Sequence, residues 1–372
     1  MKNVYKISII TNIPSPYRIN LFKFINEKTE VKVLYTDLNE KGRRQWKVNF
    51  SSGYEYKMIK KINIFSLEMS FDIIKEIIQS NLIIIGGYGL PLMQQAIILC
   101  KLFKKKYILW TDGAILKEEI FIVRVLKKFL IGNATWYITT GIKGKEHLIH
   151  YGVNPKKISL IPLTGDTDIL HENCIKFKES QNYLKLKNDL QLKRNVLITV
   201  AEIIEAKGIW ELIKAFEILK KENNGISLLL IGDGKLMGKV KEYIKEKQLK
   251  DIVLTGFIQP NEIYKYYSLG TIFVLATHYD HWGLVINEAM SCQLPVITTN
   301  MACASYELVK DDYNGFIVNA MDVEAIVEKI KILLEDKKAV ECGLNAYYTV
   351  KNINNISIAY KYIEIIDKVS RL

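Results

Sequence analysis

Residues 271–299, TIFVLATHYDHWGLVINEAMSCQLPVITT, decide how this chain folds. The stretch begins with an apolar run, Thr271–Thr277, that is typical of a buried strand, and it continues through a polar elbow, His278–Trp282. A short helix is expected to open at Gly283, and a second apolar strand follows a Leu-Pro pair. Such a unit places the N-terminus of the helix at the carboxyl end of a parallel sheet, where open α/β sheets bind ligands.

The elbow combines an anion site with two carboxylates. The free N–H groups of Gly283 and Leu284, together with the positive end of the helix dipole, favour a phosphate. Asp280 lies just ahead of the helix, and Glu288 lies four positions beyond Leu284, on the same helical face. Because carboxylates do not bind an anion, they suit the hydroxyls of a sugar or ribose. Taken alone, the acidic pair also fits a helix-start acid and an exposed helix residue.

The elbow resembles the acidic-x7-acidic signature of the retaining glycosyltransferases of family 4. The resemblance rests on Asp280, Gly283, Glu288, Ala289, Leu294 and Pro295, with Asp280 where glutamate is commoner. It implies the GT-B fold, an α/β architecture of two Rossmann-like domains facing a cleft. It further implies that Asp280 touches the donor sugar, that Glu288 holds the ribose, and that the Gly283 and Leu284 amides bind phosphate or sugar. His281 and Trp282 are expected to line the cleft.

Two further positions of the second half resemble the family. Lys207, just ahead of the expected helix 209–220, matches the lysine on the nucleotide diphosphate and would neutralise that departing group. Five residues earlier the family has an arginine, where this chain has Glu202. A carboxylate there weakens phosphate binding unless another cation compensates or Glu202 points elsewhere. Glu307 resembles a later glutamate, with a structural role or a role in the cleft.

The first half offers two candidates for substrate binding. Arg18 follows the first strand and its IPSPYR turn, and it either supplies charge to a phosphate or acceptor or packs between core and surface. Asp112 follows the expected strand 107–110, where many family members carry a histidine that contacts the donor sugar. Asp112 is therefore a departure from the family pattern.

Length and periodicity predict two domains. A chain of 372 residues is long for one core. We expect an N-terminal acceptor-binding domain over 1–168 and a C-terminal nucleotide-sugar domain over 195–352. The polar, lysine-rich and weakly periodic stretch 169–194 is expected to be a linker. The apolar-periodic tail, 353–372, is expected to form a helix that packs back on the N-terminal domain, as in GT-B folds.

Charge is unevenly distributed. Residues 1–168 contain 26 Lys and Arg against 14 Asp and Glu, while the remaining residues contain 26 of each, so the first half carries the whole net charge of +12. Clusters at Lys41, Arg43 and Arg44 and at Lys104–Lys106 contribute. A basic half favours an anionic membrane surface or a lipid-phosphate acceptor. Solvated lysines explain the clusters equally well, and no nucleic-acid-binding module is recognisable.

Several classes of protein are disfavoured. The five cysteines are widely spaced and read as reduced thiols of a cytosolic protein, and the five histidines have no metal-ligand spacing. The apolar run before Pro14 suits a strand better than a signal peptide. Leu82–Phe103 contains glycines, a proline and glutamines, which predict a strand, a turn and a helix rather than a membrane span. A dinucleotide fingerprint around Gly232 is incomplete.

The sequence and the family resemblance together predict a retaining, metal-independent glycosyltransferase of the hexosyltransferase type. It would use a nucleotide-diphosphate sugar as donor, without a further cofactor, and a glycan or lipid-linked acceptor in bacterial capsule, cell wall glycan or glycolipid biosynthesis. It would be cytoplasmic, with peripheral attachment to the inner face of the plasma membrane as a hypothesis from charge. Two alternatives stay open: a nucleotide-sugar epimerase of GT-B type, and a non-catalytic module of a polysaccharide-assembly complex.

Overall fold

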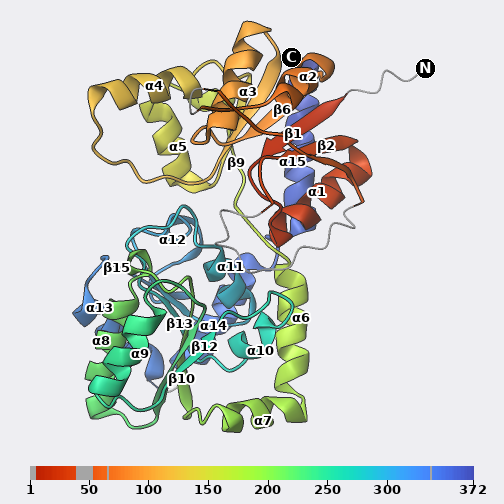
Figure 1. Ribbon diagram of the computed structural model, residues 1–372. Helices are drawn as coiled ribbons and strands as arrows, with labels where there is room; N and C mark the ends of the chain where they lie inside the picture. Colours follow the sequence, from red (N-terminus) through yellow and green to blue (C-terminus); the bar gives the residue numbers. More distant parts are fainter. Residues whose placement is uncertain (1–5, 39–52, 65–66, 336) are drawn as a thin grey trace. The chain divides into compact units, whose positions relative to one another are not determined.

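The computed structural model describes residues 6–38, 53–64, 67–335 and 337–372. The predicted basic cluster at Lys41, Arg43 and Arg44 lies outside these ranges. The chain divides into two compact units, one formed by Met1–Gly165 with Asn355–Leu372, and the other by Asp166–Asn354 (Figure 1).

The first unit contains a seven-stranded parallel sheet in the order β3-β2-β1-β6-β7-β8-β9. Its central strands are mostly apolar and buried because both faces of the sheet are covered, whereas the edge strand β3, EYKM, is partly exposed. They are β1 (Ile7–Thr11), β2 (Val31–Tyr35), β3 (Glu55–Met58), β6 (Leu82–Gly86), β7 (Lys106–Thr111), β8 (Trp136–Thr139) and β9 (Ile158–Leu160). A separate antiparallel hairpin joins β4 (Ile62–Ile64) to β5 (Leu67–Met69).

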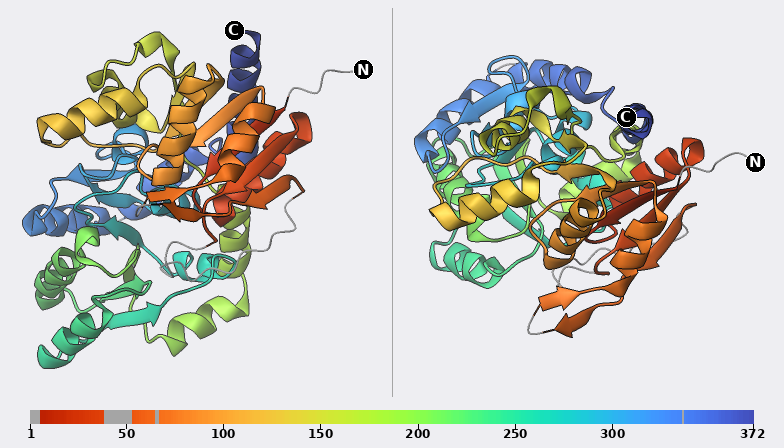
Figure 2. Two further views of the ribbon diagram at one scale, coloured as in Figure 1. Left: turned by 45° about the horizontal axis from the view of Figure 1, so that its top comes forward. Right: turned by 90° about the horizontal axis from the view of Figure 1, so that it is seen from above.

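Helices cover both faces of this sheet. One face packs against α2 (Phe71–Gln79), α3 (Pro91–Leu102), the end of α4 (Phe121–Ile131) and α5 (Gly141–His150). The other face carries α1 (Pro16–Lys28) and the C-terminal α15 (Asn355–Arg371), which lie side by side (Figure 2). The ring of Trp110 from β7 meets Tyr362 of α15 with 5.2 Å between centroids, so the C-terminal helix completes this core.

The region 82–103 forms β6, a glycine turn and α3, as the sequence predicts. In the part of the chain that the structure describes, no helix combines the length and the apolar character needed to cross a bilayer.

The second unit contains a six-stranded parallel sheet in the order β12-β11-β10-β13-β14-β15. The first strand therefore lies beside the fourth, which makes the junction of β10 and β13 the topological switch point of a doubly wound sheet. The strands are β10 (Asn195–Val200), β11 (Ile226–Ile231), β12 (Ile252–Gly256), β13 (Ile272–Leu275), β14 (Val296–Thr299) and β15 (Gly315–Val318).

One face of this sheet packs against α8 (Ile209–Glu222), α9 (Met237–Glu246) and α13 (Val323–Leu334). On the opposite face, Tyr267 of α10 (Ile263–Tyr267) lies against Phe273 of β13, and α11 (Leu284–Ser291) packs on α14 (Lys338–Val350) (Figure 1). The predicted strand, elbow, helix and strand over 271–299 are thus present as β13, a turn, α11 and β14.

The predicted linker over 169–194 is wrong, because most of this stretch is helical and belongs to the second unit. It contains most of α6 (Thr167–Lys178) and all of α7 (Gln181–Asp189). Helix α6 buries Cys174 and Phe177 beside α10 and α11. No other residue of 169–194 is buried, so the apolar period of this stretch was too weak to identify the helices.

Candidate functional site

The loops after β10 and β13 meet at the switch point of the second sheet. The Thr277 hydroxyl donates to the carbonyl of Ala206 at 2.9 Å, and the backbone N–H of His278 donates to the same carbonyl at 2.9 Å. Gly208 closes the first loop with a φ of 64°, and a Cβ there would lie 1.8 Å from the carbonyl oxygen of Ala276. Only glycine allows this close approach, and it holds the preceding residue, Lys207, against the elbow.

Lys207 and Asp280 form an ion pair across these two loops. The Lys207 Nζ lies 2.5 Å from Asp280 Oδ2, and each side chain is about one-fifth exposed. The backbone of Asp280 is held by the loop after β14, since its N–H donates to Met301 at 2.9 Å and its carbonyl accepts from Cys303 at 3.2 Å. The two charges are therefore held together at the carboxyl edge of the sheet.

The N-terminus of α11 opens directly after this pair. Gly283 precedes the helix with a φ of 92° and provides no side-chain cap. Among the described residues, none accepts a hydrogen bond from the amides of Gly283, Leu284 and Val285. These N–H groups and the helix dipole form a site that favours an anion beside the Lys207 ammonium.

Glu288 lies one turn further along α11 and is half-buried. The hydroxyl of Tyr267, which is wholly buried, donates to Glu288 Oε2 at 2.8 Å. Burial raises the pKa of Glu288 to about 7, against the hydrogen bond from Tyr267, which lowers it. The carboxyl group therefore changes its charge near neutral pH, and Oε1 remains for a further hydrogen bond.

Three other predicted residues of this unit are exposed. Glu202 is exposed just after β10, and Glu307 is exposed in α12 (Ser305–Leu308), the helix that follows the loop paired with Asp280. His281 is exposed in the elbow, with its Nδ1 3.2 Å from the Tyr279 hydroxyl.

The expectation that Trp282 lines a cleft is corrected by its burial. Its side chain is 1% exposed, and its indole Nε1 donates to Asn287 Oδ1 at 2.9 Å. A large apolar ring with a satisfied N–H is a core group, so Trp282 anchors the elbow to α11 instead of contacting a ligand.

In the first unit the structure brings Arg18 and Asp112 together. The Arg18 Nη2 lies 3.4 Å from both carboxylate oxygens of Asp112, and Nη1 donates to the Thr11 hydroxyl at 2.9 Å. The guanidinium also lies 4.7 Å from the ring centroid of Trp110. Arg18 is therefore a buried, stacked and paired group, which fits the packing alternative better than a free phosphate ligand. Asp112 keeps 39% of its side chain exposed.

Sequence reasoning missed the partners that hold the site residues. The side chain of Tyr267 holds Glu288, and that of Thr277 holds the loop at Ala206. The side chain of Asn287 holds Trp282. Tyr267 belongs to a tyrosine-rich segment, YKYY, in which no local pattern singles out one hydroxyl.

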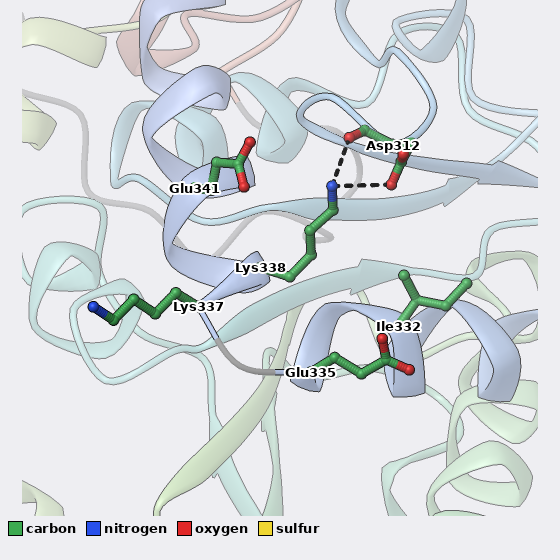
Figure 3. Close-up of a pocket in the computed structure, with 6 residues that line it drawn as sticks. All are labelled: Asp312, Ile332, Glu335, Lys337, Lys338 and Glu341. Carbon is green, nitrogen blue, oxygen red and sulfur yellow. Dashed lines mark hydrogen bonds and ion pairs between the residues drawn. The ribbon is translucent and has the colours of Figure 1, made fainter.

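Figure 3 shows a hollow elsewhere in the second unit. It is lined by Asp312, Ile332, Glu335, Lys337, Lys338 and Glu341. Lys338 pairs with Asp312 at 3.1 Å. Asp312 precedes β15, so this hollow lies at the amino edge of the sheet, opposite to the edge where the predicted residues gather. Within the described ranges, no group of three or more His, Cys, Asp or Glu is arranged to hold a metal ion.

Known proteins resemble this chain in both sequence and fold. Residues 181–348 match the family model "Glycosyl transferases group 1". The capsular polysaccharide biosynthesis glycosyltransferase CapM of Staphylococcus aureus is 30% identical over 66% of this chain and 64% of its own length. An N-acetylgalactosamine-N,N'-diacetylbacillosaminyl-diphospho-undecaprenol 4-alpha-N-acetylgalactosaminyltransferase of Campylobacter jejuni is 24% identical over 63% of this chain and 62% of its own length. These alignments thus span less than two thirds of each relative.

A solved structure extends the likeness to the whole fold. Anabaena Alr3699/HepE, crystallised in complex with UDP, superposes with a TM-score of 0.77 at 18% identity and covers 98% of this chain and 100% of its own. This likeness confirms the predicted GT-B fold class, with two parallel-sheet α/β domains and a helical C-terminus.

Proposed function

We propose that this chain transfers a sugar, with retention at the anomeric carbon, from a nucleotide-diphosphate sugar to a glycan or lipid-linked acceptor. The reaction would serve the assembly of a bacterial surface polysaccharide or glycolipid, which is the class of process named for the Staphylococcus aureus relative. One observation carries the proposal. A lysine–aspartate pair, an open helix N-terminus and a half-buried glutamate gather at the switch point of a doubly wound sheet.

Each group has a role that its surroundings support. The Lys207 ammonium and the amides of Gly283 and Leu284 would bind the diphosphate and stabilise the charge that develops as it leaves. Glu288 would accept hydrogen bonds from the ribose, because Tyr267 already orients its other oxygen. Asp280, adjacent to Lys207, would contact the donor sugar.

Electrostatics make the Lys207–Asp280 pair suitable for an anionic leaving group. In the free protein each charge neutralises the other, so neither is left unpaired at a partly buried edge. A bound diphosphate would attract the ammonium while the carboxylate keeps its position through the backbone bonds to Met301 and Cys303. With a lysine and helix amides on the phosphates, we propose that the reaction needs no metal ion. Exposed Glu202 and Glu307 would then belong to the rim of the site.

The transfer reaction itself is the test. Candidate nucleotide sugars would be incubated with the protein, a membrane lipid extract and EDTA, and the products analysed by NMR. We expect a glycosidic product whose anomeric configuration matches that of the donor. Product from the nucleotide sugar alone, with an altered sugar and no acceptor, would instead identify an epimerase. If the protein formed no product and bound no nucleotide, the non-catalytic module would be favoured.

Nucleotide-sugar binding should depend on pH through Glu288. A raised pKa means that the free protein holds the proton until about pH 7, whereas ribose hydroxyls donate best to the ionised form. Affinity should therefore rise as the pH increases and level off above neutrality, with binding about tenfold weaker at pH 6 than at pH 8. Calorimetry with the intact nucleotide sugar, whose phosphates do not titrate here, would measure this change. The Glu288→Gln variant should lose the dependence, and an unchanged slope in it would refute the assignment.

We further propose that the protein works at the cytoplasmic face of the membrane, because a lipid-linked acceptor lies there and the basic charge gathers in residues 1–168.

A further inference from the structure

Helix α4 presents an apolar face to solvent, the reverse of what a surface helix normally does. Phe121 is 80% exposed and Ile122 is 72% exposed. Val125, Leu126 and Phe129 are each at least half exposed as well. At 100° per residue these five side chains fall within one arc of roughly 140° along the helix. Only Leu130 and Ile131 of α4 are buried, so the arc is not the face that packs on the first unit.

The apolar arc continues onto the end of α3. Helices α3 and α4 are in contact (Figure 1). The Lys101 ammonium lies 4.3 Å from the ring centroid of Phe129. Directly after Lys101, Leu102 is 69% and Phe103 46% exposed. The apolar surface therefore spans the outer side of α4 and the C-terminal end of α3; we refer to it below as the α3–α4 surface.

Basic side chains border this surface. Lys104 and Lys128 are exposed beside the apolar groups, and Arg124 lies on the same helix. The acids nearby are Glu118, which is exposed, and Glu119. Glu119 is already engaged, since Lys127 Nζ lies 2.6 Å from its Oε2 and the Tyr151 hydroxyl donates to Oε1 at 2.6 Å. The border is thus predominantly positive.

We propose that the α3–α4 surface docks the protein onto an anionic lipid bilayer, with the apolar arc of α4 inserted at the level of the headgroups. Eleven residues extend only about 16 Å, too short to cross a hydrocarbon core of about 30 Å, so the helix would lie in the plane of the interface. The positive border matches the anionic headgroups, and residues 1–168 carry the whole net charge of the chain. This docking proposal rests on the proposed function only in that docking would bring a lipid-linked acceptor to the enzyme.

Vesicle sedimentation tests the docking without any sugar chemistry. The full-length protein would be mixed with vesicles of phosphatidylcholine, or of equal parts phosphatidylcholine and phosphatidylglycerol. We expect sedimentation with the mixed vesicles that weakens as salt screens the headgroups. The double substitution Phe121→Asp with Ile122→Asp should reduce binding at least about tenfold. Lys104→Glu with Lys128→Glu should reduce binding to the mixed vesicles by roughly tenfold or more.

A matched pair on the second unit controls for surface charge. Val340 and Leu344 of α14 are 74% and 43% exposed, and replacing both by Asp should leave vesicle binding unchanged. Nucleotide affinity of the α4 variant should equal that of the wild type, which separates docking from the donor site. Its thermal unfolding followed by circular dichroism should also match the wild type, which reports that the first unit is folded. Wild-type protein that stays in the supernatant with both vesicles would overturn the proposal. So would equal losses in the α14 variant, or a dimer in light scattering that the α4 substitutions convert to a monomer.

Discussion

Replacing Lys207 by alanine should lower kcat/KM for sugar transfer by about 10²–10³, the effect of removing one group that stabilises developing negative charge in a preorganised site. The ammonium lies 2.5 Å from Asp280 Oδ2 and beside the open N-terminus of α11. Without it, the diphosphate loses its cation and also meets the unpaired carboxylate of Asp280, so leaving-group departure and donor binding should both suffer. Initial rates with the cognate donor would measure the effect.

Two further variants separate charge from packing. Lys207→Arg keeps the positive charge and should recover part of the rate. Recovery should be incomplete because the planar, delocalised guanidinium does not reproduce the compact charge of an ammonium. Lys214→Ala removes an exposed lysine from α8 in the same unit and should leave the rate unchanged. If Lys207→Ala retained the wild-type rate, the diphosphate would have to bind elsewhere.

The sequence predicted the central stretch of the second unit, residues 271–299, in detail because its signals are local. The strands of the central stretch are continuous apolar runs, and the glycine and polar residues between them identify the turn and the start of α11. The family resemblance assigned Lys207 and Asp280 to one site, and the sheet agrees with it because parallel strands place their carboxyl ends at one edge. The ion pair itself could not be predicted, since their positions differ by 73 residues.

The failures involve burial that arises only in the folded chain. Helix α6 is stabilised by the burial of Cys174 and Phe177 beside α10 and α11. Two buried residues in a lysine-rich segment do not produce a recognisable helical period of apolar residues. Trp282 looked like a ligand-binding aromatic because its neighbours are polar, yet its indole turns inward to Asn287.

The partners of individual charges were equally hidden. The pKa of Glu288 depends on its burial, which raises it, and on the hydrogen bond from Tyr267 of another helix, which lowers it. Arg18 meets Asp112 across the first sheet. In both cases the sequence identifies a charged side chain, whereas its protonation or its availability to a ligand is set by folded surroundings.

Calorimetric titration of UDP, GDP and ADP in the presence of EDTA tests most directly whether the second unit binds a nucleotide through Glu288. The wild-type protein would be compared with Glu288→Ala and with Glu324→Ala, which removes an exposed acid from the first turn of α13. Because two ribose hydroxyls would lose a charged acceptor, worth about 2–3 kcal/mol, the account predicts micromolar binding of one nucleotide that weakens roughly 30- to 150-fold in Glu288→Ala. Glu324→Ala should bind as the wild type does. Failure of all three nucleotides to bind, or equal affinity in Glu288→Ala, would contradict the account.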